Sequence, residues 1–247
     1  MKETRVIMGT PVTLEVVDAS VTQQHLERVF AYFDYVDQTF STYKETSEIS
    51  QINAGVHPEE QWSKDMKFVM RACNKTKEET NGYFDILRDG IQDPSGYVKG
   101  WAIQNAAELL TSMGFTNYYV DAGGDLQVAG HNTEGTAWTI GIRNPFNREE
   151  IVKRVALNNQ GMATSGTYIR GQHIYNPHNF AENLDEVVSL TVIGPAIVDA
   201  DRFATAAFAM GKQGIEFIAN LSGFEGYQIT QDGIATFTPG FTSYILP

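Results

Sequence analysis

The chain has 247 residues, of which 42% are hydrophobic and 19% are charged, as in an ordinary soluble globular protein with a sizeable core. Its formal net charge of −12 argues against a broad nucleic-acid-binding surface. A phosphate ligand would therefore need a bound cation or a local Lys or Arg. The one cysteine, Cys73, excludes an internal disulfide and lies in a helical pattern typical of a buried thiol.

The N-terminal segment MKETRVIMGTPVTLEVVD has neither an apolar signal core nor a small-residue cleavage site. No stretch approaches the roughly 18 apolar residues that a membrane span needs. We therefore expect a cytoplasmic protein without a membrane span. An exported protein whose leader is absent from this sequence would look the same.

The first half of the chain is predicted to form a hairpin followed by helices. The β-branched segment VIMGTPVTLEVV indicates an opening strand or hairpin. Apolar residues at helical spacing predict helices over Val21–Phe40 and Lys64–Thr80, with the polar segment FSTYKETSEISQIN between them. The loop DPSGYVKG then precedes a third helical face, which runs from Ala102 to Gly114.

The second half is predicted to be richer in strands. NYYVDAGGDLQVAG indicates a strand, a Gly-rich turn and a strand, and AWTIGIRNP, VVSLTVIGP, YQIT and IATFTPGF indicate further strands. Helices are expected over Asp201–Met210 and Gln213–Leu221. Because helices and strands do not strictly alternate, the expected fold class is α+β, in one domain spanning residues 1–247.

The loop DPSGYVKG has the features of an anion site. Gly96 and Gly100 would let a ligand approach the backbone, Lys99 adds a positive charge, and a helix N-terminus offers unpaired N–H groups. These features suit a phosphate or a pyrophosphate, although the GxxxxGK[ST] spacing is absent. A helix-capping turn with a solvated lysine fits the same residues.

Three other segments carry candidate groups, and each also has a structural explanation. The adjacent glycines Gly123 and Gly124 allow positive φ angles or a close backbone approach, and a hairpin turn explains them equally well. Asp201 and Thr205 share a helix face and offer hard oxygen ligands of the kind Mg²⁺ prefers, but helix capping or a solvated face also explains them. His173 could accept a proton near neutral pH or form a structural hydrogen bond.

Short motifs occur in a fixed order between Ile7 and Met210: MGT, FSTY, SEISQIN, NGYFD, DPSGYVKGWA, DAGGD, ATSG, HIYNP and DRFATA. This ordered set resembles the FAD:protein FMN transferases of the ApbE family. The resemblance implies that the protein splits FAD at its pyrophosphate with Mg²⁺ and attaches FMN through a phosphoester to a threonine of an acceptor flavoprotein or domain, releasing AMP. It also implies an α+β fold with FAD in a cleft between two halves of one domain.

The resemblance assigns roles to individual residues of this sequence. His173 and Asp201 are the implied catalytic residues, with His173 or a carboxylate near the metal as the base. The implied metal ligands are the Gly96 carbonyl and the side chains of Asp201 and Thr205. The implied FAD-contacting residues are Met8, Tyr43, Tyr83, Phe84, Asp85, Asp93, Lys99, Gly123, Gly124, Ser165, His173 and Ile174.

Two other functions are compatible with the same motifs. An FAD pyrophosphatase would use the same site with water as the acceptor. A non-catalytic FAD-binding protein would not need the metal set, so the presence of Asp93, Lys99, Asp201 and Thr205 argues against it. The sequence departs from the usual family pattern at DPS, where DLG is common, and at Asn176, where the family has an acid.

Overall fold

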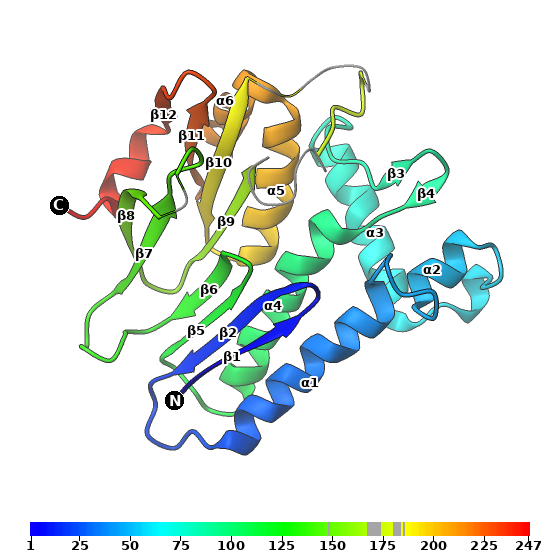
Figure 1. The fold of residues 1–247 in the computed structure, drawn as a ribbon, viewed down its shortest axis with the longest axis horizontal. Coiled ribbons are helices and arrows are strands. Elements are labelled where there is room, and N and C mark those ends of the chain that lie inside the picture. Colours follow the sequence, from blue (N-terminus) through cyan, green and yellow to red (C-terminus); the bar gives the residue numbers. More distant parts are fainter. Residues whose placement is uncertain (148, 167–173, 180–183, 185) are drawn as a thin grey trace.

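An antiparallel sheet of eight strands forms the centre of the computed structural model, which describes residues 1–147, 149–166, 174–179, 184 and 186–247 (Figure 1). The strands are β1 (Lys2–Ile7), β2 (Thr10–Val16), β5 (Tyr118–Ala122), β6 (Asp125–Ala129), β9 (Gly161–Gly166), β10 (Val187–Gly194), β11 (Glu225–Thr230) and β12 (Ala235–Phe237). They follow the order β1-β2-β5-β6-β9-β10-β11-β12 across the sheet, and neighbouring strands are antiparallel.

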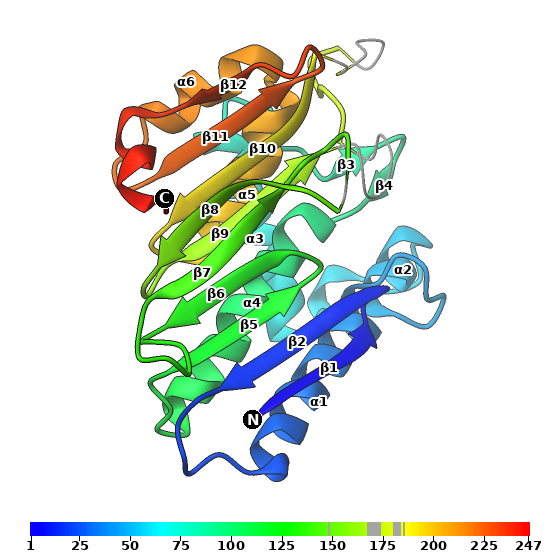
Figure 2. The ribbon, with the colours of Figure 1, turned by 60° about the vertical axis from the view of Figure 1, so that its left-hand side comes forward.

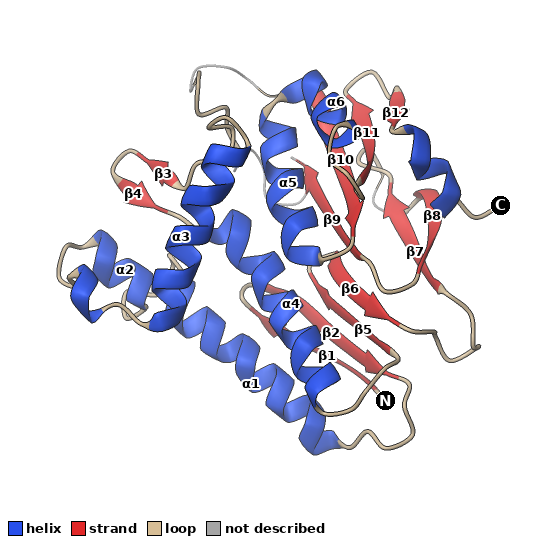
Figure 3. Ribbon diagram, turned by 180° about the vertical axis from the view of Figure 1, so that it is seen from behind, coloured by secondary structure: helices blue, strands red, loops and turns tan. Residues whose placement is uncertain are grey.

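Helices cover one face of this sheet. The helices are α1 (Gln23–Phe40), α2 (Glu48–Asn53), α3 (Lys64–Glu79), α4 (Ser95–Ser112), α5 (Ile197–Ala209) and α6 (Gly214–Ala219), with 3-10 segments η1 (Glu59–Gln61), η2 (Gly211–Gln213) and η3 (Pro239–Tyr244). Figure 3 shows α1, α4, α5 and α6 in front of the sheet, with α2 and α3 further out. Of the helices in the part of the chain that the structure describes, none is both long enough and apolar enough to span a bilayer.

Two small hairpins lie outside the central sheet. One joins β3 (Leu87–Arg88) to β4 (Ile91–Gln92), and the other joins β7 (Trp138–Arg143) to β8 (Ile151–Leu157). The β7–β8 hairpin and η3 lie on the face of the sheet opposite the helices (Figure 2). They bury a second, smaller hydrophobic cluster there, in which Trp138 and Leu157 of the hairpin and Phe241 of η3 contact side chains of β6, β9, β10 and β11. The molecule therefore has three layers.

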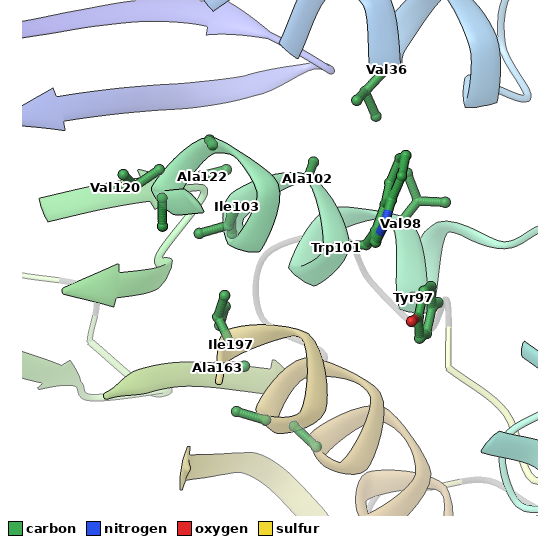
Figure 4. Close-up of a cluster of buried hydrophobic side chains, with 14 of the residues drawn as sticks. Val36, Tyr97, Val98, Trp101, Ala102, Ile103, Val120, Ala122, Ala163 and Ile197 are labelled. Carbon is green, nitrogen blue, oxygen red and sulfur yellow. The ribbon is translucent and has the colours of Figure 1, made fainter. Parts of the chain in front are cut away.

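Helix α4 lies at the centre of the main core, where it packs against other elements on several sides. Figure 4 shows its side chains between Val36 of α1, Val120 and Ala122 of β5, and Ile197 of α5. A helix buried on several sides carries apolar residues around most of its circumference, which explains why its hydrophobic face is broad. This position fixes the start of α4 relative to α5 and to the sheet.

The structure confirms the α+β class and most of the expected elements, and it corrects several boundaries. The loop predicted at Asp93–Gly100 is a loop only to Pro94, because α4 already begins at Ser95. Gly96 and Gly100 suggested an irregular segment, but both lie within α4, at the place where α5 packs closely against α4. The polar segment after α1 contains α2, whose N-terminus is capped by Ser47. Strand β8 was not predicted, because its sequence IVKRVAL carries two adjacent charges. In the structure only Val155 and Leu157 of this strand are buried.

Candidate active site

A pocket of about 230 Å³ lies between the first turns of α4, the middle of α5, the end of β9 and the segment that follows α3. We call it the central pocket. Residues from segments far apart in the sequence line it, because the sheet order brings β9 and α5 beside α4. The residues named above as candidates that line it are Tyr83, Phe84, Asp85, Asp93, Gly96, Lys99, Gly123, Ser165, Ile174, Asp201 and Thr205.

A second pocket of about 500 Å³ adjoins the central pocket and shares Thr10, Asp93, Ser95 and Lys99 with it. We call it the adjoining pocket. It contains the two remaining candidates near the N-terminus, Met8 and Tyr43. The Tyr43 side chain is almost fully exposed at 97%, so a ligand could cover it without displacing other side chains.

Met8 enters the adjoining pocket because of the turn between β1 and β2. Ile7 pairs with Thr10, so the hairpin loop consists of Met8 and Gly9 alone. Both have positive φ angles, 55° and 69°, as a type I′ turn requires. Gly9 adopts this conformation readily, whereas Met8 is held in it at a cost of about 1 kcal/mol. The MGT motif thus combines a tight turn with a strained methionine at the pocket wall.

The residues expected to hold a divalent cation lie where α4 contacts α5. A Cβ atom on Gly96 would lie 3.2 Å from Cγ2 and 3.6 Å from Oγ1 of Thr205, so this hydroxyl is close to the α4 backbone. The Gly100 N–H, which in a regular α-helix bonds the carbonyl of Gly96, donates to Oδ2 of Asp201 at 2.7 Å. A carbonyl, a carboxylate and a hydroxyl are hard oxygen ligands of the kind that Mg²⁺ prefers, so these residues fit the ion.

Among the described residues, no group of three or more His, Cys, Asp or Glu side chains is arranged to hold a metal ion. A cation at this position would therefore depend on a backbone carbonyl and a hydroxyl as well as on Asp201. Such a site would take its remaining ligands from a phosphate substrate and water, as Mg²⁺ sites commonly do.

Two buried carboxylates flank Lys99. Its ammonium forms an ion pair with Asp125 and lies 3.6 Å from Oδ1 of Asp201. Burial raises the pKa of the Asp201 carboxyl above its ordinary value, Lys99 opposes that rise, and Asp125 adds to it. When both acids are ionised, Lys99 neutralises only one of their two negative charges, so the cluster keeps a net negative charge.

The turn between β5 and β6 requires glycine at Gly123 for two reasons. Its φ is 67°, and a Cβ atom there would overlap Oγ1 of Thr10. Gly123 lines the central pocket, whereas Gly124 lines a separate cavity on the other side of the turn, with Asp121 and Tyr119. The Gly124 N–H donates to Oδ1 of Asp121 at 3.3 Å. Hairpin geometry and close backbone approach thus both account for the glycine pair.

The segment after α3 forms the opposite wall of the central pocket. The Phe84 ring is buried, and the backbone N–H of Phe84 donates to Oγ1 of Thr80 at 3.1 Å. Asp85 accepts hydrogen bonds from Lys77 at 2.6 Å and from the Leu87 N–H at 3.0 Å. Both carboxylate oxygens therefore bind groups of the protein, which fixes the position of the YFD motif.

Several contacts hold the rim near Ile174, among them a hydrogen bond from Tyr175 Oη to the Asp85 carbonyl at 2.9 Å. Asn176, the departure from the family pattern, is buried and accepts the His178 N–H at 2.9 Å, so it closes a turn. The His178 ring packs edge-on against Tyr83, with ring centroids 4.6 Å apart. The other candidate in this region, His173, lies outside the described residues.

The sequence analysis did not identify several residues at or behind the pocket walls, among them Thr10, Arg88, Tyr175 and Asp125. Arg88 supplies a second cation, and its guanidinium lies 4.8 Å from the centre of the Tyr175 ring. The signal for Arg88 was the Asp89–Gly90 pair, whose positive φ angles form a two-residue hairpin turn. Asp125 gave no local signal, because its partner Lys99 comes from another element.

A profile of the ApbE family matches residues 8–93 and 88–227 of the chain. The chain is 30% identical over 172 residues to the FAD:protein FMN transferase of Escherichia coli K12, which covers 65% of this chain and 49% of that protein. It is 32% identical over 160 residues to the FAD:protein FMN transferase of Haemophilus influenzae, which covers 58% of this chain and 45% of that protein. The chain therefore spans about half the length of the curated relatives it matches.

Solved structures share the fold over the whole chain. The flavin transferase ApbE from Vibrio cholerae matches with a TM-score of 0.86 and 21% identity, over 99% of this chain and 98% of that chain. The ApbE protein from Thermotoga maritima matches with a TM-score of 0.87 and 21% identity, over 100% and 99% of the two chains. At this identity the likeness establishes the fold.

Proposed function

Because the chain belongs to the ApbE family, we propose that it is a Mg²⁺-dependent FAD:protein FMN transferase. The substrates are FAD and a protein that presents a threonine hydroxyl, and the products are the FMN-modified protein and AMP. The observation that carries the proposal is the convergence of Gly96, Lys99, Asp201 and Thr205 on one pocket. These residues supply hard oxygen ligands and a cation, which are the two features that a diphosphate needs in an acidic protein.

In the reaction, the threonine oxygen attacks the phosphorus on the FMN side of the diphosphate. The new P–O bond forms as the bond to the bridging oxygen breaks, and AMP departs with the electron pair. The hydroxyl proton passes to a base, for which His173 or a carboxylate beside the metal is our candidate. The flavin and adenine ends of FAD extend from this point into the central and adjoining pockets, which share the Lys99 wall.

The Gly96 carbonyl, Asp201 and Thr205 would hold Mg²⁺, which when bound stabilises negative charge on the phosphoryl oxygens and on the departing AMP. Lys99 places a full positive charge at the same wall and offsets the repulsion between the diphosphate and the acidic protein. Phe84 closes one side with an apolar ring, which limits the access of water to the phosphorus.

The test is an incubation of the protein with FAD, Mg²⁺ and an acceptor domain that contains a threonine. In-gel flavin fluorescence reports covalent transfer, and an assay for AMP reports cleavage. Fluorescent acceptor together with AMP is the expected result. Release of AMP and FMN without labelling would instead identify an FAD pyrophosphatase, and the absence of both would identify a non-catalytic FAD-binding protein.

A further inference from the structure

One buried carboxylate beside the central pocket has no role in the proposed reaction. Asp125 is 2% exposed and does not line the pocket. It is the first residue of β6, directly after the Gly123–Gly124 turn. Burying a carboxylate costs several kcal/mol unless specific partners compensate it, so its partners indicate its role.

Both oxygens of Asp125 have such partners. Oδ1 accepts the Thr164 N–H of β9 at 2.8 Å, which fixes the plane of the carboxylate. Oδ2 forms the ion pair with the ammonium of Lys99. A backbone hydrogen bond on one oxygen thus aims the other oxygen at a lysine that belongs to α4.

The position of Lys99 matters because of the second carboxylate beside it. The ammonium contacts Asp125 directly, and it forms a second, longer ion pair with Oδ1 of Asp201 at 3.6 Å. Without Asp125, the nearest anion to this ammonium would be Asp201. The lysine would then move onto the carboxylate that the proposed metal site needs.

A second polar residue on the same face of β6 holds the other helix of the site. Gln127 is two residues from Asp125, so the two side chains point to the same side of the strand. Its Oε1 accepts the Ile197 N–H at the start of α5 at 2.9 Å. Strand β6 therefore ties both Lys99 of α4 and the start of α5, the helix that carries Asp201, to the sheet.

We propose that Asp125 is a positioning residue for phosphoryl transfer: it holds the Lys99 ammonium at the wall of the central pocket and keeps it from moving closer to Asp201. This inference rests on the proposed function. Since it acts through Lys99, Asp125 should matter only when Lys99 is present. Removing its negative charge should not weaken the binding of the anionic FAD in the ground state.

The experiment compares Asp125→Asn with the parent, with Asp125→Glu and with Lys99→Met, each alone, and with the double variant. The matched control is Asp121→Asn, because Asp121 is a half-buried carboxylate on the neighbouring strand that accepts hydrogen bonds from the Tyr119 hydroxyl and the Gly124 N–H. Turnover is measured by AMP release with FAD, Mg²⁺ and the threonine-bearing acceptor domain. FAD affinity is measured separately by flavin fluorescence with EDTA, and folding is checked by urea unfolding.

Asp125→Asn is expected to lower turnover by about 10- to 100-fold, the range for residues that orient the ligands of a metal site. Its FAD dissociation constant without metal should be unchanged or smaller, and Asp125→Glu should recover part of the turnover. In the Lys99→Met background, Asp125→Asn should cost no more than about twofold, because a residue that acts through another is not additive with it.

Turnover of Asp125→Asn within about twofold of the parent would overturn the inference. The same loss in the Lys99→Met background, or an equal loss in Asp121→Asn, would also overturn it. If the parent itself released no AMP, the proposed function would fail instead. A weaker metal-free binding of FAD by Asp125→Asn would also contradict the inference, because it would indicate a damaged pocket rather than a misplaced lysine.

Discussion

Replacing Gly100 by alanine tests the close approach of α4 and α5 on which the site depends. A Cβ atom on Gly100 would lie 2.7 Å from Cβ of Asp201 and 3.1 Å from the Ile197 carbonyl oxygen. Carbon atoms in favourable contact are about 3.5–4.0 Å apart. Neither neighbour can rotate away, since Cβ and the carbonyl are fixed to the backbone of α5, so the two helices must separate by several tenths of an ångström.

Two opposing terms set the expected magnitude. Overpacking of this kind costs about 1–3 kcal/mol. Alanine in a helix interior gains about 1 kcal/mol over glycine. Separation of the helices also lengthens the bond from the Gly100 N–H to Asp201, now 2.7 Å, which adds to the cost. The free energy of unfolding of Gly100→Ala should therefore be about 1–2 kcal/mol lower than that of the parent.

The assay is urea unfolding followed by circular dichroism, with linear extrapolation to water. Gly96→Ala is the matched control, because it is the same substitution in the same helix. A Cβ atom there would meet only the ends of side chains, Cγ2 of Thr205 at 3.2 Å and Cε2 of Phe84 at 3.3 Å. Its unfolding free energy should change by less than about 1 kcal/mol. A Gly100→Ala variant that is as stable as Gly96→Ala would refute the close approach.

Three further predictions follow from the site and its surroundings. Burial raises the pKa of Asp121 from 3.8 to about 6, so the folded protein loses up to about 3 kcal/mol of stability as pH rises from about 4 to about 6. Asp121→Asn should abolish this loss and be more stable than the parent at pH 7. An unchanged pH dependence of its unfolding free energy in urea titrations would contradict the prediction. Met8→Asn should raise the unfolding free energy by about 0.5–1 kcal/mol, because Asn tolerates a positive φ. The same variant should bind FAD more weakly in fluorescence titrations. A less stable variant would show that the turn is not strained. His173→Ala should lower turnover by about 10²–10⁴-fold with little change in FAD affinity, and near-normal turnover would move the role of base to a carboxylate.

Local periodicity was enough to predict the long elements of this fold. The apolar spacing over Val21–Phe40 anticipated α1, which begins at Gln23, and the β-branched N-terminal segment anticipated the β1–β2 hairpin. The order of the strands was not predictable, because β6 pairs with β9, and the β7–β8 hairpin of another sheet lies between them in the sequence. Pairing between segments far apart in the chain leaves no trace in the local pattern.

The candidate residues were identified through the order of the family's motifs, whereas the residues that support them were not. The start of α4 was mistaken for a loop because Gly96 and Gly100 are poor helix formers, and the reason for Gly100 is its contact with α5. Asp125 could not be singled out, since its position in DAGGD is explained by a turn alone. Its partner Lys99 becomes its neighbour only when β6 packs against α4.

The mass of the acceptor after incubation tests the central claim most directly. The parent protein, incubated with FAD, Mg²⁺ and a threonine-bearing acceptor domain, should increase the intact mass of the acceptor by one FMN less one water, and fragmentation should place the addition on the threonine. Asp201→Ala removes the one charged group of the proposed metal donor set, so it should give no such product at the same Mg²⁺ concentration while still binding FAD. Full modification of the acceptor by Asp201→Ala, or none by the parent, would contradict the account.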